Sequence, residues 1–351
     1  MDIRREKEEI RKRRADIDAE ILALLVKRAQ LSKQWAASHA GEVATLPSTE
    51  RQTLEELSSG NLGALPREAV ESIFREIHAA CRALEAPVRV AFVGVPGGHG
   101  YVAARGQFGP SASYAPVESA SAAVADVEAK RADFAVLPYE TAAEGPVNPT
   151  LVALRRSDLK IIAVHPVDAP LCLLSRTGNP QDVEKVYATA SDRAAVSGAL
   201  AALAPKAVVL DVRSPLVACQ LAAEDHGAAA LALEPVGRAL DLSVIGQLAA
   251  DEARARFCVA SSRPATRSGR DVTTLLFSVS DEPGALFEVL KHFAERGVNL
   301  RKIHSWPGDA EWGYVFFLEI SGHVTDRALV TALEGMKQRT KMLKILGSHS
   351  V

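Results

Sequence analysis

The sequence is poor in cysteine, in net charge and in long apolar runs, and each shortage excludes a class of protein. Its four cysteines are scattered without CxxC spacing, which argues against a disulfide framework and a structural zinc site: Cys81, Cys172, Cys219 and Cys258. A net charge of −2 provides no basic surface for nucleic acid or membrane. Neither a bilayer span nor a secretory signal is apparent. We therefore expect a cytoplasmic protein with no metal, no cofactor, and neither a membrane nor a nucleic-acid partner.

The chain of 351 residues is too long for one ordinary core and divides into three blocks. Residues 1–86 contain no convincing strand, residues 88–262 alternate strands with Ala-rich helices, and residues 271–351 form a third block. The segment 261–270, rich in Ser, Arg, Pro and Gly, is expected to be a linker. These boundaries predict three domains.

The first block is expected to be helical. One helix of about forty residues ends at Gly41, a second begins at Ser48, and a third begins at Pro66. So long a helix needs a partner helix, because a short domain cannot bury its apolar face. The residues of that face recur at helical spacing: Ile10, Ile17, Ile21, Leu24, Leu25, Val26 and Leu31.

The second block is expected to be an α/β domain with a largely parallel sheet. Short β-branched and apolar runs bounded by turn residues predict its strands. These runs span residues 88–94, 134–138, 159–164, 183–187, 207–210 and 228–233.

The third block predicts a turn that binds a small carboxylate. A strand at 275–279 runs into Pro283-Gly284, and a helix follows. The start of that helix offers unpaired backbone N–H groups, which suit an anion. Gly297 ends the helix, and the next strand begins at Val298.

Residues 284–287 read Gly-Ala-Leu-Phe, and residues 304–307 read His-Ser-Trp-Pro. Together they resemble the ACT domain, a βαββαβ module, in the phenylalanine-sensing form found at the end of prephenate dehydratases. Trp306 and His304 stand where that family has arginine and glutamate, so the identity of the effector stays open. The resemblance implies these ligand-binding residues: Gly284, Ala285, Leu286, Phe287, Asn299, Ser305 and Trp306.

The run from Ile10 to Arg28 resembles the first helix of AroQ-type chorismate mutases. The reaction is a pericyclic rearrangement of a dianion, so catalysis consists of clamping two carboxylates, a task that suits the planar fork of arginine. The resemblance implies that three arginines bind chorismate, that His39 replaces an essential lysine, and that Glu85 lies beside the ether oxygen. The three arginines are Arg11, Arg28 and Arg51.

The spacing of two of these arginines predicts a dimer. Arg11 and Arg28 are 17 residues apart on one helix, which corresponds to about 25 Å. One small substrate cannot contact both, so a shared site takes one of them from a second chain. This agrees with the intertwined helical dimer that the resemblance implies, and the expected assembly is a homodimer or a higher homo-oligomer.

Three motifs in the middle block resemble the prephenate dehydratase domain, which has two α/β lobes with a cleft between them. They lie at residues 90–104, 137–145 and 255–257. The resemblance implies that Thr141 and Arg256 act on prephenate. Ala255 stands where the family has a catalytic threonine. Several other hydroxyl-bearing positions also differ, and His99 is either a replacement acid or an exposed loop residue.

The order of the blocks resembles the bifunctional P-protein of phenylalanine biosynthesis. The expected fold is multidomain: all-α AroQ-type chorismate mutase helices, a two-lobed α/β dehydratase-like domain, and an α+β ACT domain. The expected ligands are chorismate, prephenate and, as effector, phenylalanine. Two alternatives stay open: a mutase whose middle domain is only a scaffold, and a non-catalytic sensor or partner protein that binds aromatic ligands.

Overall fold

A computed structural model describes residues 3–38, 53, 54, 56–60, 62–141, 145–249, 254–308 and 313–351. The chain forms two compact units. The first comprises residues 1–88 and 108–113, and the second comprises residues 89–107 and 114–351. Of the helices in the described ranges, none is both long and apolar enough to cross a membrane.

In the first unit, α1 (Ile3–Ser38) packs against α3 (Arg67–Glu85). Pro66 caps the start of α3 with φ −61°, the value its ring imposes. The expected first and third helices are thereby confirmed, with α1 ending three residues before Gly41. The expected start of the second helix lies outside the described residues.

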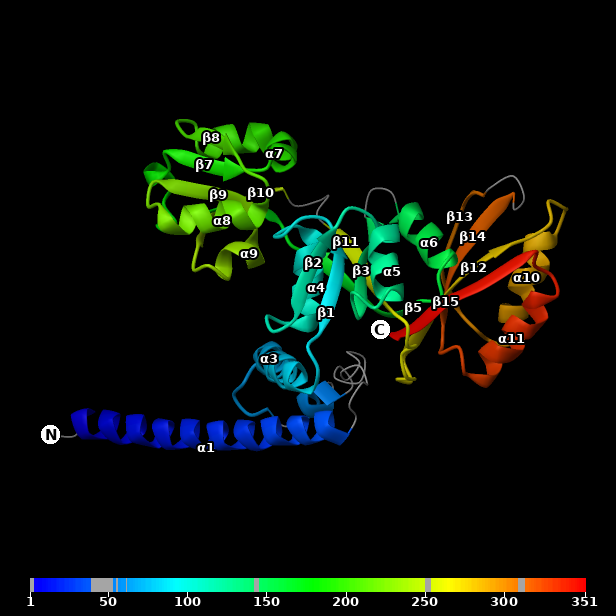
Figure 1. Cartoon of the computed structure of the whole chain (residues 1–351), viewed down its shortest axis with the longest axis horizontal. Helices are drawn as coiled ribbons and strands as arrows, with labels where there is room; N and C mark the ends of the chain where they lie inside the picture. Colours follow the sequence, from blue (N-terminus) through cyan, green and yellow to red (C-terminus); the bar gives the residue numbers. More distant parts are fainter. Residues whose placement is uncertain are drawn as a thin grey trace. The chain divides into compact units, whose positions relative to one another are not determined.

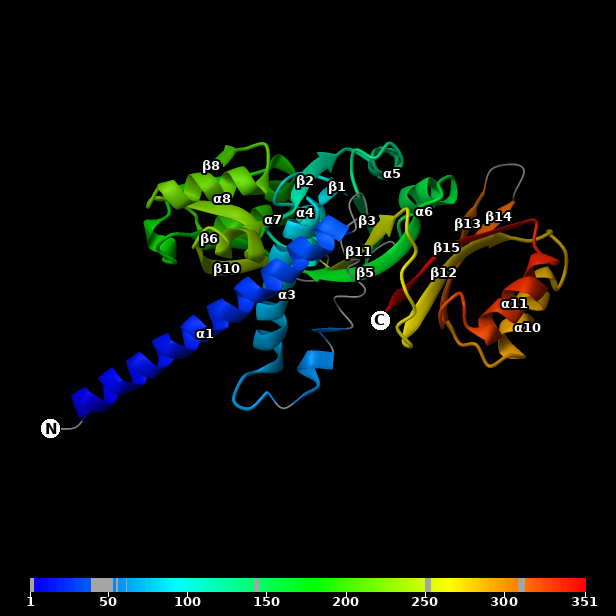
Figure 2. The ribbon, with the colours of Figure 1, turned by 60° about the horizontal axis from the view of Figure 1, so that its bottom comes forward.

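Helix α1 is much longer than the helix it packs against, as Figures 1 and 2 show. Its 36 residues span about 54 Å, whereas the 19 residues of α3 span about 28 Å. The apolar side chains that define its face are therefore largely open to solvent in a single chain. Ile17 is 55% exposed, Leu24 63% and Leu31 64%.

Two mixed sheets form the first part of the second unit. The first sheet has the order β2-β1-β3-β11-β5, with β4 paired to β3. Its strands are β1 (Arg89–Val93), β2 (Ser113–Val117), β3 (Phe134–Thr141), β4 (Gly145–Pro146), β5 (Lys160–Asp168) and β11 (Arg254–Ser261). Helices α4 (His99–Phe108), α5 (Ala120–Glu128) and α6 (Asn148–Arg155) connect them.

The second sheet has the order β10-β6-β9-β7-β8. Its strands are β6 (Leu171–Ser175), β7 (Lys185–Ala188), β8 (Val208–Asp211), β9 (Ala228–Leu233) and β10 (Ser243–Ala249). The helical turn η1 (Pro180–Asp182) and helices α7 (Ala190–Leu203), α8 (Pro215–Glu224) and α9 (Glu234–Arg238) complete this lobe.

The expectation of a largely parallel sheet was wrong. Strand β11 runs antiparallel to both β3 and β5, and β6 runs antiparallel to both β9 and β10. Parallel pairs occur from β1 to β3 and among β7, β8 and β9, where helices lie between the strands along the chain. The strands missed by the sequence reading include β6 and β11, which supply this antiparallel pairing.

The C-terminal part of the second unit has the expected βαββαβ order. Its antiparallel sheet runs β13-β14-β12-β15, and helices α10 and α11 cover one face, as Figure 1 shows. Leu275, Phe277 and Ile320 pack under these helices, whereas Leu276 and Phe317 pack on the opposite face against the first sheet. The elements are β12 (Asp271–Ser278), α10 (Ala285–Ala294), β13 (Leu300–Pro307), β14 (Tyr314–Ser321), α11 (Arg327–Lys337) and β15 (Met342–Ser350).

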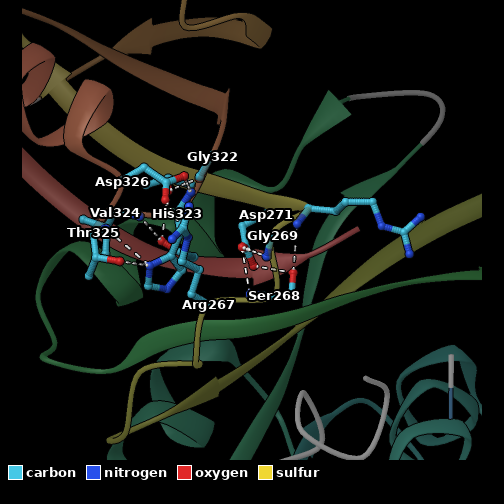
Figure 3. Close-up of polar contacts among 12 residues, drawn as sticks. Arg267, Ser268, Gly269, Asp271, Gly322, His323, Val324, Thr325 and Asp326 are labelled. Carbon is cyan, nitrogen blue, oxygen red and sulfur yellow. Dashed lines mark hydrogen bonds and ion pairs between the residues drawn. The ribbon is translucent and has the colours of Figure 1, made fainter. Parts of the chain in front are cut away.

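The linker before β12 is tied to the C-terminal sheet rather than left free (Figure 3). Asp271 accepts hydrogen bonds from the backbone N–H of Ser268 and of Gly269, each at 2.9 Å. Arg267 pairs with Asp326 at 2.7 Å, and the backbone N–H of His323 donates to the same carboxylate at 2.8 Å. These contacts tie the linker to the start of β12 and to the turn between β14 and α11.

Candidate functional site

A pocket of about 290 Å³ lies where three strands of the first sheet end. Strand β11 begins here, between the last residues of β3 and β5, because it runs antiparallel to both. Ala255 is therefore directly opposite Thr141 on one side and Val167 on the other. The pocket is lined by Glu140, Thr141, Pro166, Val167, Asp168, Ala255 and Arg256.

Arg256 is the one cation among the described residues that line the pocket. Its Nη1 donates to Glu140 Oε2 at 2.8 Å, and its Nη2 lies 3.4 Å from Glu319 Oε1. The guanidinium also lies over the Tyr139 ring, 5.3 Å from the ring centroid. Burial alone lowers the pKa of Arg256, but the charge of Glu319 and the hydrogen bond to Glu140 outweigh burial and raise it.

A β-bulge explains how two neighbouring residues both reach Arg256. The pairing of β3 with β11 shifts by one residue between Arg256 and Phe257. Tyr139 and Glu140 consequently lie together opposite Arg256, as two residues of a bulged strand oppose one residue of its partner. The bulge aims both a ring and a carboxylate at one guanidinium.

Glu140 is held by a second cation as well. Lys302, from the edge strand β13, donates to Glu140 Oε1. Burial raises the pKa of Glu140, but the hydrogen bonds and charges of Lys302 and Arg256 outweigh burial and lower it. Glu140 is therefore ionised throughout the neutral range.

A buried tyrosine, Tyr139, also contacts these charged side chains. The residue is fully buried, its hydroxyl donates to Glu319 Oε1 at 2.8 Å, and it lies 3.1 Å from the Thr274 hydroxyl. Burial, then the charge of Glu319, raises the pKa of Tyr139 well above its usual value. Tyr139 is thus a neutral donor. We call the following residues the Arg256 network: Tyr139, Glu140, Arg256, Thr274, Lys302 and Glu319.

The lowered pKa of Glu140 predicts a pH-dependent contribution to stability. The contribution is fully present above the ordinary glutamate pKa of about 4.3 and is lost as pH falls through the lower pKa of the folded state. At pH 7 we expect Glu140→Gln to lower the midpoint of thermal unfolding by roughly 2–4 °C. The difference from wild type shrinks as the pH is lowered below about 4. An unchanged difference down to pH 2 contradicts the assignment.

The first unit brings together some of the expected mutase residues. Arg28 Nη1 lies 3.5 Å from the Ile77 carbonyl oxygen, and the Ser32 hydroxyl donates to Glu85 Oε1 at 3.0 Å. Arg28 and Glu85 therefore lie along the seam between α1 and α3. Arg11 is exposed and lies 4.0 Å from Glu8 on the same helix, far along α1 from that seam. His39 and Arg51 lie outside the described residues.

The turn at Gly284 has the geometry expected of an anion receptor. Gly284 is left-handed, with φ +84°, and stands at the N-cap of α10 without a side-chain cap. The N–H of Ala285 donates to the Glu282 carbonyl oxygen at 3.2 Å, so the next N–H groups, those of Leu286 and Phe287, are the ones a ligand can use. Ala285 and Leu286 are half-buried, whereas Phe287 is 64% exposed. Asn299 and Ser305 are exposed.

Trp306 lies on the face of the C-terminal sheet that packs against the first sheet, and its expected contact with a ligand remains a prediction. Successive residues of a strand point to opposite faces of the sheet, so Trp306 and Ser305 face opposite ways. Trp306 is 8% exposed and packs with Val315 and Phe317 in the core that faces the first sheet, away from α10. Burial of its large ring in this core accounts for the position.

His99 begins α4 and is half-buried rather than exposed. Burial lowers its pKa, opposed by the charge of Asp192, so the ring is neutral at pH 7. His99 is not among the residues that line the pocket. The structure thus gives no support to the alternative in which it replaces a catalytic acid.

Sequence reasoning missed three charged residues of this site: Glu319, Lys302 and Asp168. Glu319 gave a usable signal, since it is one acid within the apolar strand Tyr-Val-Phe-Phe-Leu-Glu-Ile-Ser, and a buried acid requires a partner. Asp168 and Lys302 gave none, because both occur where charged residues are common. Within the described ranges, no group of three His, Cys, Asp or Glu side chains is placed to hold a metal ion.

Comparison with protein families divides the chain into three matching segments. Residues 10–86 match the model of chorismate mutase type II, residues 90–265 match prephenate dehydratase, and residues 273–337 match the ACT domain.

Comparison with individual proteins finds similarity along almost the whole chain. It is 37% identical to the bifunctional chorismate mutase/prephenate dehydratase of Aquifex aeolicus, over 98% of each chain. Among solved structures, prephenate dehydratase from Arthrobacter aurescens in complex with L-Phe is 29% identical, with a TM-score of 0.60 over 75% of this chain and 90% of that one. A protein described as a quorum quenching acylase is 26% identical, with a TM-score of 0.60 over 75% of this chain and 98% of that one.

Proposed function

Because this chain belongs to the bifunctional chorismate mutase/prephenate dehydratase family, we propose that it rearranges chorismate to prephenate and converts prephenate to phenylpyruvate. The observation that carries the second activity is the pocket containing Arg256, the cation that two carboxylates hold in place. We assign the mutase to residues 1–86, the dehydratase to residues 88–262 and the sensor to residues 271–351.

The mutase step needs a binding site that holds chorismate in a compact conformation. Arg28 and Glu85 are already on one seam, where Arg28 binds a carboxylate and Glu85 lies beside the ether oxygen. In the proposed site Arg11 comes from the second subunit, and His39 and Arg51 complete the clamp.

The dehydratase step breaks two bonds of prephenate. The ring carboxylate leaves as carbon dioxide, its electron pair enters the ring, and the ring hydroxyl leaves as water after accepting a proton. Arg256 binds a substrate carboxylate and so holds prephenate in the orientation that loss of carbon dioxide and water requires. Of the seven residues described as lining the pocket, Thr141 alone carries a hydroxyl, and it lies directly opposite Ala255. We assign to Thr141 the hydrogen bond at the leaving hydroxyl, in place of the threonine that Ala255 replaces.

We further propose that the working form is a homodimer joined through α1. The open apolar face of α1 extends beyond α3, and a second copy of the same helix covers it with matching chemistry. The same arrangement brings the second subunit's Arg11 to the seam that holds Arg28. The dimer therefore completes the mutase site and buries the exposed face.

Phenylalanine is the proposed effector, bound at the start of α10. The available N–H groups at Gly284 receive its carboxylate, and the exposed Phe287 and Ser305 flank it. A related dehydratase has been solved in complex with L-Phe, which supports this choice. The proposed location is the cytoplasm, consistent with four free, buried cysteines.

The proposed function is tested by supplying chorismate, with and without phenylalanine, and identifying the products. We expect prephenate and then phenylpyruvate, with phenylpyruvate suppressed by phenylalanine. Accumulation of prephenate alone supports the mutase with a scaffold domain. Binding of phenylalanine without consumption of chorismate or of added prephenate supports the non-catalytic sensor.

A further inference from the structure

We propose that the C-terminal sheet contributes a positioning residue, Glu319, to the dehydratase pocket, so that the sensor domain sets the orientation of Arg256. The inference rests on the proposed dehydratase function and extends it. Glu319 helps to build the pocket, and through it the binding of the effector at α10 changes the pocket. Both binding and turnover of prephenate therefore report on its role.

The two terminal nitrogens of Arg256 are anchored by carboxylates from different domains. Glu140, from the dehydratase lobe, takes Nη1, and Glu319, from β14 of the C-terminal sheet, takes Nη2. A planar guanidinium held at both ends has one orientation, whereas one held at a single end can rotate about that contact. Glu319 therefore determines how Arg256 presents its remaining donors to the pocket.

Glu319 is placed to act as a rigid anchor. It is 4% exposed, and a buried carboxylate is costly unless it is paired and hydrogen-bonded. Arg256 supplies the charge, and the Tyr139 hydroxyl donates to the same oxygen at 2.8 Å. The Tyr139 ring is fixed in turn by an edge contact with Phe317, with ring centroids 5.9 Å apart.

Three residues of the network form one row across the C-terminal sheet. Glu319 is directly paired with Thr274 on β12 and with Lys302 on β13. Residues opposite one another in a ladder share a face of the sheet, so the row points as a unit at the dehydratase lobe. There Thr274 meets Tyr139, and Lys302 meets Glu140.

The row also links strand β13, which borders the proposed phenylalanine site, to the pocket. Strand β13 carries Ser305, which flanks the proposed phenylalanine site, and Lys302 lies three residues earlier on the same strand. A ligand shifts a conformational equilibrium only through a contact that differs between two states. In this proposal two contacts differ between the states. Lys302 with Glu140 joins β13 to the pocket lining, and Glu319 with Arg256 joins β14 to it.

The test compares Glu319→Gln with Glu334→Gln, a matched change at an exposed acid on α11. Glutamine keeps the size of Glu319 but removes the charge that anchors Arg256. We expect Glu319→Gln to raise KM for prephenate about tenfold, with a smaller change in kcat, because the ion pair that anchors Arg256 Nη2 is lost. We also expect at least a tenfold weaker inhibition by phenylalanine, while its Kd from equilibrium dialysis changes less than about twofold.

Lys302→Met provides a second, independent variant, since it removes the cation from Glu140 Oε1 and leaves the contacts of Glu140 and Glu319 with Arg256 in place. It is expected to weaken inhibition by phenylalanine in the same direction, with chorismate turnover unchanged. The proposal is overturned if both variants match Glu334→Gln in KM for prephenate and in inhibition. It is also overturned if Glu319→Gln loses phenylalanine binding and folding together while Lys302→Met has no effect.

Failure of the proposed function is distinguishable from failure of this inference. Wild-type protein that binds prephenate in dialysis but does not consume it lacks the dehydratase activity. In that case an increase of about tenfold in the prephenate Kd of Glu319→Gln still supports the positioning role. Wild-type protein that neither binds nor consumes prephenate overturns both.

Discussion

Replacement of Arg256 by alanine is expected to reduce kcat/KM for prephenate by at least two orders of magnitude. Arg256 is the one cation among the described pocket residues, and Glu140 and Asp168 remain there to repel a substrate with two carboxylates. Removing one partner of a charge pair that the bound substrate buries costs about 2–5 kcal/mol, and 1.36 kcal/mol corresponds to a tenfold change in rate. Phenylpyruvate formation from prephenate, followed at several substrate concentrations, measures the loss.

The same variant carries an internal control, because chorismate turnover belongs to the other unit of the chain. We expect that turnover to stay within about twofold of wild type. Arg256→Lys separates charge from geometry: lysine keeps the charge but cannot hold Glu140 and Glu319 with one planar group. An intermediate loss is expected, mostly in KM. Wild-type dehydratase rates in Arg256→Ala contradict the assigned role.

The elements that the sequence predicted well depend on local patterns. The third helix begins at Pro66 as expected, because proline fits the start of a helix and nowhere else within it. The strand at 228–233 is continuous and apolar, and it coincides with β9. The order of elements in the C-terminal domain follows from turn residues such as Gly284 and Gly297, both of which have positive φ.

The Arg256 network was beyond such reasoning because it depends on long-range pairing. Lys302 and Glu140 are separated by 162 residues, and a one-residue bulge decides that Tyr139 and Glu140 share Arg256. The position of Trp306 illustrates the same limit. Its motif predicts a ligand contact but does not say which face of the sheet it occupies, and the alternation of β13 turns it toward the first sheet.

Arg11→Ala and Arg28→Ala are each expected to abolish most chorismate turnover when made separately, and to restore part of it when mixed. In the proposed dimer each site takes Arg28 from one subunit and Arg11 from the other. A mixed dimer then has one site lacking both arginines and one site lacking neither. Random exchange of subunits makes about half of the dimers mixed, so about a quarter of wild-type activity returns. Chorismate consumption after co-refolding equal amounts measures this recovery.

The control for complementation is a mixture in which recovery is impossible. The double variant Arg11→Ala with Arg28→Ala, refolded with either single variant, leaves at least one arginine missing from every site, so no activity returns. Dehydratase activity provides the reference for folded protein in all samples, since Arg256 is unchanged.

A dimer-breaking change, Ile17→Glu, places a charge in the open face of α1, where Ile17 is 55% exposed in the single chain. It is expected to give monomers in sedimentation and to eliminate the recovery. A different outcome is that the mixture of the two single variants forms dimers and still regains no activity. In that case Arg11 and Arg28 of different subunits do not share a site, and the intertwined arrangement is wrong.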